Sequence, residues 1–124
     1  MNTNKVNNAN EGDNDQYLSS GQANSNLMST EYVHHIDEAH GWIEVSKGLL
    51  QFLGIERKIS SFSYMNGTDV YLEEDSDFGI FSKEYQRIFG QRPTLFQQHS
   101  KTNSSPLREY EDYDGEKVAL SWNM

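Results

Sequence analysis

The dipeptide Asn66-Gly67 constrains the fold of this chain more tightly than any other feature of its sequence. It separates two runs rich in apolar and aromatic residues, 59–65 and 68–74. Asn-Gly favours a two-residue type I′ turn, because both central positions of that turn require a positive φ angle. A turn centred on this pair sets a register that places Phe62 opposite Tyr71. The pattern therefore predicts an antiparallel hairpin in the middle of the chain.

A strand and a short helix are predicted before the hairpin. Residues 41–45 form a β-branched and aromatic run bounded by glycine and serine, which is typical of a strand. Ser46 can then cap a helix over residues 47–53, and Gly54 can end that helix in the left-handed conformation. Ile55 is expected to fold back on the helix as the hydrophobic contact of a Schellman cap.

A second helix and another strand are predicted after the hairpin. Asp75 or Ser76 is the expected N-cap, and aromatic residues recur at helical spacing from 78 to 89. Gly90 ends this helix, and residues 94–99 have the composition of a strand. The order is the βαββαβ pattern of the ferredoxin-like fold. The expected fold class is therefore α+β, with a small antiparallel sheet and two helices on one face.

The first thirty residues have a different composition from the rest of the chain. They hold eight asparagines and few large apolar side chains. Such a segment cannot offset the cost of ordering its backbone, about 1–2 kcal/mol per residue. Residues 1–30 are therefore predicted to be a disordered tail, and residues 31–124 a single α+β domain.

The two ends of the predicted domain carry weaker signals. Residues 31–40 are expected to form a short helix or an irregular lead-in. The segment 105–124 is expected to pack on a core formed by residues 41–99. A further hairpin is predicted across Asp114-Gly115, which would align Val118, Leu120 and Trp122 on one face.

The composition excludes several classes of protein. No cysteine is present, so disulfides and zinc–thiolate sites are ruled out. The net charge of −9 is spread along the chain, which argues against direct binding of nucleic acid through phosphate contacts. No run approaches the length of a membrane span, and no signal peptide is visible. We therefore expect a cytoplasmic protein without a membrane partner.

No motif predicts an enzyme or a cofactor. Ser60, Ser61 and Ser63 lie on a predicted strand, without the sharp strand-to-helix turn of a nucleophile elbow. Gly67 lies in a turn and Gly79 in a helix, so neither belongs to a phosphate-binding loop. We expect no catalytic residue and no cofactor.

Histidines and carboxylates near residue 35 are the candidates for a metal site. On a helix, His34 and Glu38 would share one face, a spacing that can bind a divalent ion, and His35 and His40 lie close by. The stretch has no established zinc motif such as HExxH, and a solvated polar segment is the simpler interpretation. No metal site is predicted, and these four residues are the weak candidates.

The acidic run 73–77 is a second place where a cation could bind. A calcium loop needs alternating oxygen ligands and a glycine in the turn, and this run has neither. Asp75 and Asp77 are expected to cap the second helix instead.

Aromatic side chains are predicted to gather on one face of the sheet. If the helices cover the other face, strand alternation groups Trp42, Phe62, Tyr64, Tyr71 and Phe96. An exposed aromatic patch of that size is typical of a binding surface. In one alternative the segment 105–124 folds over the patch and buries it. In a second alternative, a protein partner or a second copy of the chain docks there. Nucleic acid and a small ligand are the remaining alternatives.

Two resemblances extend this interpretation. The run from residue 42 to 74 resembles the swapped-hairpin half of AbrB-type transition-state regulators, through residues 49–55 and 60–73. The proline that usually precedes the helix and the basic DNA-contacting residues of that family are absent. Residues 40–110 are similar to a pattern in short uncharacterised proteins of bacteria, phages and plasmids. The segments that carry this second likeness are HGWIEV, LLQFLGI, KISSFSY, VYLEED and SSPLREY.

These observations favour a non-enzymatic interaction protein, of an accessory kind, from a phage, plasmid or other mobile element. It would dock on a protein partner, or on a second copy, through the aromatic sheet face or a sheet edge. One alternative is an acidic nucleic-acid mimic that inhibits a DNA-binding or host-defence protein. The other is a small transcriptional regulator, which the AbrB resemblance implies.

Overall fold

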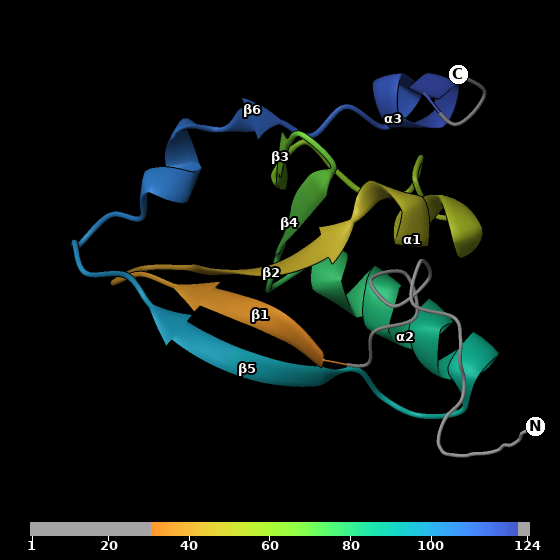
Figure 1. Ribbon diagram of the computed structural model, residues 1–124, viewed down its shortest axis with the longest axis horizontal. Helices are drawn as coiled ribbons and strands as arrows, with labels where there is room; N and C mark the ends of the chain where they lie inside the picture. Colours follow the sequence, from red (N-terminus) through yellow and green to blue (C-terminus); the bar gives the residue numbers. More distant parts are fainter. Residues whose placement is uncertain (1–30, 122–124) are drawn as a thin grey trace, which may run out of the picture.

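The computed structural model describes residues 31–121, whose backbone forms a six-stranded sheet and three α-helices (Figure 1). The predicted tail over residues 1–30 and the predicted position of Trp122 lie outside the described residues. No helix within residues 31–121 is both long enough and apolar enough to cross a membrane. In chain order the elements are β1 (Glu31–Ile36), β2 (Gly41–Ser46), α1 (Lys47–Phe52), β3 (Tyr64–Asn66), β4 (Asp69–Glu73), α2 (Asp77–Phe89), β5 (Thr94–His99), the 3₁₀ helix η2 (Pro106–Glu109), β6 (Glu111–Asp112) and α3 (Gly115–Ser121).

The strand order in the sheet is β5-β1-β2-β4-β3-β6. The pairing of β1 with β5 is parallel, and every other pairing of the described strands is antiparallel. If β1 and β6 are left out, the remaining order is β5-β2-β4-β3, which is the strand order of a βαββαβ fold. The predicted α+β class is therefore confirmed, with one strand inserted inside the predicted sheet and one added at its edge. The sheet is open and has this order within one chain, which is the βαββαβ arrangement that the sequence predicts.

Strand β1 corrects the prediction for residues 31–40. These residues were expected to form a short helix or an irregular lead-in, and residues 31–36 are instead a strand paired on both sides. Tyr32 packs edge-on against Phe81 and Tyr85 of α2, with ring centroids 5.6 and 5.9 Å apart. Contacts with elements distant in sequence fix this segment, and its two histidines hide the strand alternation from a local analysis.

The predicted hairpin is present, and its register differs from the prediction by one residue on each strand. Asn66 pairs with Asp69, so the loop is Gly67-Thr68, and Gly67 has a φ of +62°. This register pairs Met65 with Val70, both buried on the helix-covered face, whereas the predicted one would pair Met65 with exposed Thr68. Burial of the apolar pair therefore decides the register.

The shift of register changes what lies beside Tyr71. Tyr64 is its cross-strand partner, and the predicted pairing of Phe62 with Tyr71 is wrong. Phe62 lies in the loop before β3 and is largely exposed.

Helix α1 begins and ends as its sequence predicts. The Ser46 hydroxyl accepts a hydrogen bond from the Leu49 N–H at 3.0 Å. Gly54 has a φ of +72°, and the Ile55 N–H donates to the Leu50 carbonyl at 3.0 Å. This is the predicted Schellman arrangement, with Ile55 buried against the helix.

Helix α2 ends at Gly90 as predicted, but its first turn differs from the prediction. Ser76 occupies the N-cap position without a side-chain capping bond. Asp77 is buried and accepts hydrogen bonds from Ser60 and Ser63, so its predicted role as a capping residue is wrong.

The predicted hairpin across Asp114-Gly115 is wrong, because residues 115–121 form helix α3. The Asp114 carboxylate accepts hydrogen bonds from the Glu116 and Lys117 N–H groups, both at 3.1 Å. An aspartate before a glycine suits a helix N-cap as well as a turn, and here the helix buries Val118 and Ala119.

The core consists of two clusters on opposite faces of the sheet. The larger cluster lies under α1, α2 and α3 and contains most of the buried aliphatic residues. The smaller cluster comprises Trp42, Tyr71 and Leu107, with Tyr64 and Tyr110 packed against it. Figure 1 shows how the C-terminal segment leaves β5, passes around the sheet and ends beside α1. That segment therefore contributes to both clusters.

Candidate functional site

The aromatic face, which is the sheet face opposite α1 and α2, is partly covered by the strap, residues 100–110. Leu107 of the strap packs with Trp42 and Tyr71, and the Tyr110 ring centroid lies 5.2 Å from that of Tyr71. Trp42 and Tyr71 are only 3% and 7% exposed. Burial, with Glu44 nearby, raises the pKa of the Tyr71 phenol well above its usual range. The strap thus shields two of the five predicted binding residues from solvent.

An ion pair between Arg108 and Asp37 fixes the strap to the β1–β2 loop. Arg108 Nε and Nη2 lie 2.7 and 3.2 Å from the two oxygens of the Asp37 carboxylate, whose side chain is fully buried. The Arg108 guanidinium also lies 5.1 Å from the centre of the Trp42 ring. The arginine, together with three backbone N–H donors, holds the pKa of the Asp37 carboxyl well below its usual range. This geometry is that of a strong charge-assisted pair.

Two cavities lie on the aromatic face, one on each side of the strap. The first, called the Phe62 cavity, measures about 410 Å³ and is lined by His40, Trp42, Phe62, Tyr64, Glu73 and Arg108 among others. The second measures about 360 Å³, and its lining includes His35, Tyr71, Gln98, Leu107 and Tyr110.

The predicted partner-binding residues are divided between these places. Trp42, Phe62 and Tyr64 meet at the Phe62 cavity, whereas Tyr71 lines the second cavity. Phe96 lies apart from both, on strand β5 beside Val33 of β1. Phe62 is 75% exposed and Phe96 is 54% exposed. One cavity thus gathers three of the five residues.

The weak metal candidates His34, His35, Glu38 and His40 do not come together. The Nε2 atom of His34 lies 2.8 Å from the Oε1 atom of Glu74, and that of His35 lies 2.7 Å from the Oε1 atom of Glu44. Successive residues of a strand point to opposite faces, so the two histidines are separated by the sheet. The helical spacing that would have joined His34 to Glu38 is absent, because residues 31–36 are a strand.

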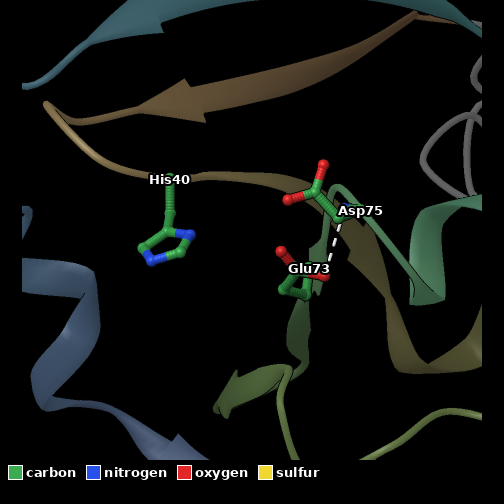
Figure 2. A group of neighbouring side chains, drawn as sticks. All are labelled: His40, Glu73 and Asp75. Atoms are coloured by element: carbon green, nitrogen blue, oxygen red, sulfur yellow. Dashed lines mark hydrogen bonds between the residues drawn. The ribbon is translucent and has the colours of Figure 1, made fainter.

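His40 instead lies beside the end of β4, in a cluster that the sequence analysis missed. One donor atom each of His40, Glu73 and Asp75 lies within 4.8 Å of the other two. Figure 2 shows the three side chains, with one ring nitrogen of His40 on the side of the two carboxylates. Glu73 Oε1 accepts hydrogen bonds from the Asp75 N–H at 3.0 Å and the Ser76 hydroxyl at 2.9 Å.

The pairing of β2 with β4 is the feature that brings these three residues together, and the sequence alone does not show it. Trp42 pairs with Glu73, which brings the residues before β2 next to the residues after β4. The acidic run 73–77 is divided as a result, because Glu73 and Asp75 face His40 whereas Asp77 is buried with the serines. A local analysis of the run could not show this division.

Comparisons with protein-family models, with curated proteins and with solved structures find no match to this chain. The site is therefore interpreted from its geometry and chemistry.

Proposed function

We propose that this protein is a non-enzymatic interaction protein that docks on another protein through Phe62 and the cavity beside it. The observation that carries the proposal is a phenylalanine 75% exposed at an aromatic-lined cavity. Leaving a phenylalanine in water forfeits about 1.5–3 kcal/mol relative to burying it. Aromatic residues beside a well-formed pocket are typical energetic centres of protein interfaces.

The surroundings of Phe62 have the composition of an interface. Trp42 and Tyr64 provide an apolar wall, and their rings lie 6.0 Å apart. His40, Glu73 and Arg108 add polar and charged groups at the same cavity. Aromatic residues and arginine are enriched in interfaces, with polar groups at the rim.

The strap supports the proposal because it fixes one wall of the cavity. Leu107 packs on Trp42, and Arg108 lies over the Trp42 ring while it is bonded to Asp37. A wall held in this way loses little conformational freedom when a partner docks. An accessory role in a phage, plasmid or other mobile element rests on the sequence resemblance alone. A cytoplasmic location is proposed from the absence of cysteine in the sequence.

Site-specific photo-crosslinking tests the proposal. A photo-reactive benzoylphenylalanine at position 62 should crosslink a protein of defined mass in the cells that make this chain. The same substitution at Phe52 is the control, because Phe52 is also exposed and stacks on Phe89 at the helices. A product of twice the chain mass would identify a second copy as the partner. A position 62 that crosslinks no more than position 52 would contradict the proposal.

Affinity for the crosslinked partner then separates the alternatives. Phe62→Ala should weaken binding by roughly 30-fold, the equivalent of about 2 kcal/mol, without changing the thermal midpoint. Binding should depend weakly on salt, because the contact is apolar. A steep salt dependence without an effect of Phe62→Ala would instead favour the acidic mimic of nucleic acid. Retention of the chain on DNA itself would favour the regulator.

A further inference from the structure

We propose that His40, Glu73 and Asp75 bind a zinc ion at the rim of the Phe62 cavity. The proposal is independent of docking, because it rests on the donor atoms alone. Each residue offers one ligand atom, and the three atoms lie within 4.8 Å of one another. They come from the β1–β2 loop, from the end of β4 and from the turn before α2, so the fold brings them together.

The set of donors suits zinc better than magnesium or calcium. It consists of one imidazole nitrogen and two carboxylate oxygens, a combination that zinc accepts in protein sites. Magnesium and calcium take six or more oxygen ligands and seldom use imidazole. Tetrahedral zinc with bonds of about 2.0–2.2 Å places its donors roughly 3.3–3.6 Å apart. His40 and Asp75 are exposed, so small side-chain rotations can close the remaining gap.

The Glu73 side chain and the His40 backbone are already held in place. The Glu73 carboxylate is bonded by the Asp75 N–H and the Ser76 hydroxyl, and a carboxylate with about four lone-pair positions can accept a metal as well. The His40 backbone exchanges hydrogen bonds with Asp37, its N–H donating to the carboxylate at 2.9 Å. Binding would therefore order chiefly the side chains of His40 and Asp75.

The electrostatics of the site also favour a cation. Two carboxylates face the proposed position, and the nearby guanidinium of Arg108 is paired with Asp37. Three protein ligands leave one position of a tetrahedral zinc open. His40 and Glu73 both line the Phe62 cavity, so that open position has an approach from the cavity.

Isothermal titration of zinc chloride into the tag-free, metal-stripped full-length chain tests the proposal. We expect one zinc per chain, and an affinity that falls at least tenfold in His40→Ala and in Asp75→Asn. Both residues are exposed, so both variants should keep the thermal midpoint of the parent chain. His99→Ala, an exposed histidine on β5, is the matched control and should bind zinc as the parent does.

Fluorescence of Trp42 gives a second reading, because its ring lies 6.1 Å from the His40 ring. In a Trp122→Phe background, Cu²⁺ should quench this fluorescence at saturation. A large molar excess of zinc should reverse the quenching, because Cu²⁺ binds such donors more tightly than zinc does. His40→Ala should abolish the effect. Zinc binding that survives both His40→Ala and Asp75→Asn, or no binding at millimolar zinc, would overturn the proposal. Crosslinking from position 62 is measured without added metal, so failure here leaves the docking proposal standing.

Discussion

Asp77 connects three separate elements through one buried carboxylate. Its Oδ2 atom accepts hydrogen bonds from the Ser60 N–H at 3.1 Å, the Ser60 hydroxyl at 2.7 Å and the Ser63 hydroxyl at 2.6 Å. Ser63 Oγ accepts in turn from the Glu73 N–H at 2.9 Å. The loop before β3, the start of α2 and the end of β4 are therefore held by one network. A buried acid is tolerated here because its charge is met by donors.

Replacing Asp77 should be costly, and replacing its neighbour should not. Asp77→Ala leaves the buried Ser63 hydroxyl and two Ser60 donors without their acceptor, and we expect a loss on the order of 3 kcal/mol. Asp75→Ala removes an exposed acid two residues away and should change stability by about 0.5 kcal/mol or less. Urea unfolding of the metal-free variants measures both. If Asp77→Ala cost no more stability than Asp75→Ala, the hydrogen-bond network around Asp77 would contribute little to the stability of the fold.

Asp37 makes the stability of the folded protein decrease as the pH falls. Arg108 holds the pKa of Asp37 in the folded state below the value of about 3.9 expected in the unfolded chain. The unfolded state therefore binds the proton first as the pH falls. The stability that Asp37 contributes is complete above about pH 5 and decreases as the pH falls toward 2.

Removing the Asp37 carboxylate tests whether it causes this loss of stability at low pH. Asp37→Asn should lower the unfolding free energy at pH 7 and flatten its decline between pH 5 and pH 2. The difference between parent and variant should shrink toward low pH, by up to about 1.4 kcal/mol per pH unit for one proton. Parallel curves would show that Asp37 titrates alike in both states.

At the scale of the element, the hairpin depends on the sign of one backbone angle. An added Cβ would meet nothing within 4 Å at either Gly67 or Gly79, so space is not limiting at either position. They differ in conformation, because Gly67 has a φ of +62° in the loop and Gly79 lies within α2. This makes them a matched pair for one substitution.

Alanine at the two glycines should act in opposite directions. Gly67→Ala should cost roughly 1–2 kcal/mol, because an L side chain disfavours the left-handed region. Gly79→Ala should stabilise the protein by about 0.4–1 kcal/mol through the higher helix propensity of alanine. Thermal unfolding of both variants measures the difference. A Gly67→Ala variant as stable as the parent would mean that the loop does not require this angle.

Elements with signals in their own residues were predictable from the sequence. Ser46, Gly54 and Gly90 mark helix ends by local chemistry, and Asn66-Gly67 marks the hairpin. Strand β1 and helix α3 were not predictable in this way. β1 is a strand because β2 and β5 pair with it, and α3 is a helix because Val118 is buried beside α1. Tertiary contacts override weak local preference in both cases.

The candidate site was predictable in its residue types and not in its arrangement. Strand alternation correctly placed Trp42, Tyr64 and Tyr71 on one face, because it needs only the strand assignment. The cluster of His40 with Glu73 depends on which strands are neighbours, and that is decided by the whole sheet.

At the scale of the whole molecule, the C-terminal segment holds the sheet from both sides. Leu107 lies in the small cluster on the aromatic face, whereas Tyr113 and Val118 lie in the main core. The Gln51 side-chain amide donates to the Val118 carbonyl at 2.8 Å, which ties α3 to α1. Deleting residues 105–124 would therefore remove parts of both clusters at once, and point substitutions are needed to separate them.

Two alanine substitutions on opposite faces should act independently. Leu107→Ala and Val118→Ala each remove buried methyl groups, and each should cost about 2 kcal/mol. Because the sheet separates the two sites, the double variant should lose the sum of the two effects, within about 0.5 kcal/mol. Leu107→Ala combined with Tyr71→Ala should deviate from additivity by roughly 0.5–3 kcal/mol, since both residues belong to one cluster. Urea unfolding of the three single and two double variants, with a hydrophobic dye as a second probe, measures the coupling. Strong coupling between Leu107 and Val118 would mean that the segment folds and unfolds as one unit. In that case the strap could not be released from the aromatic face without loss of α3 from the core.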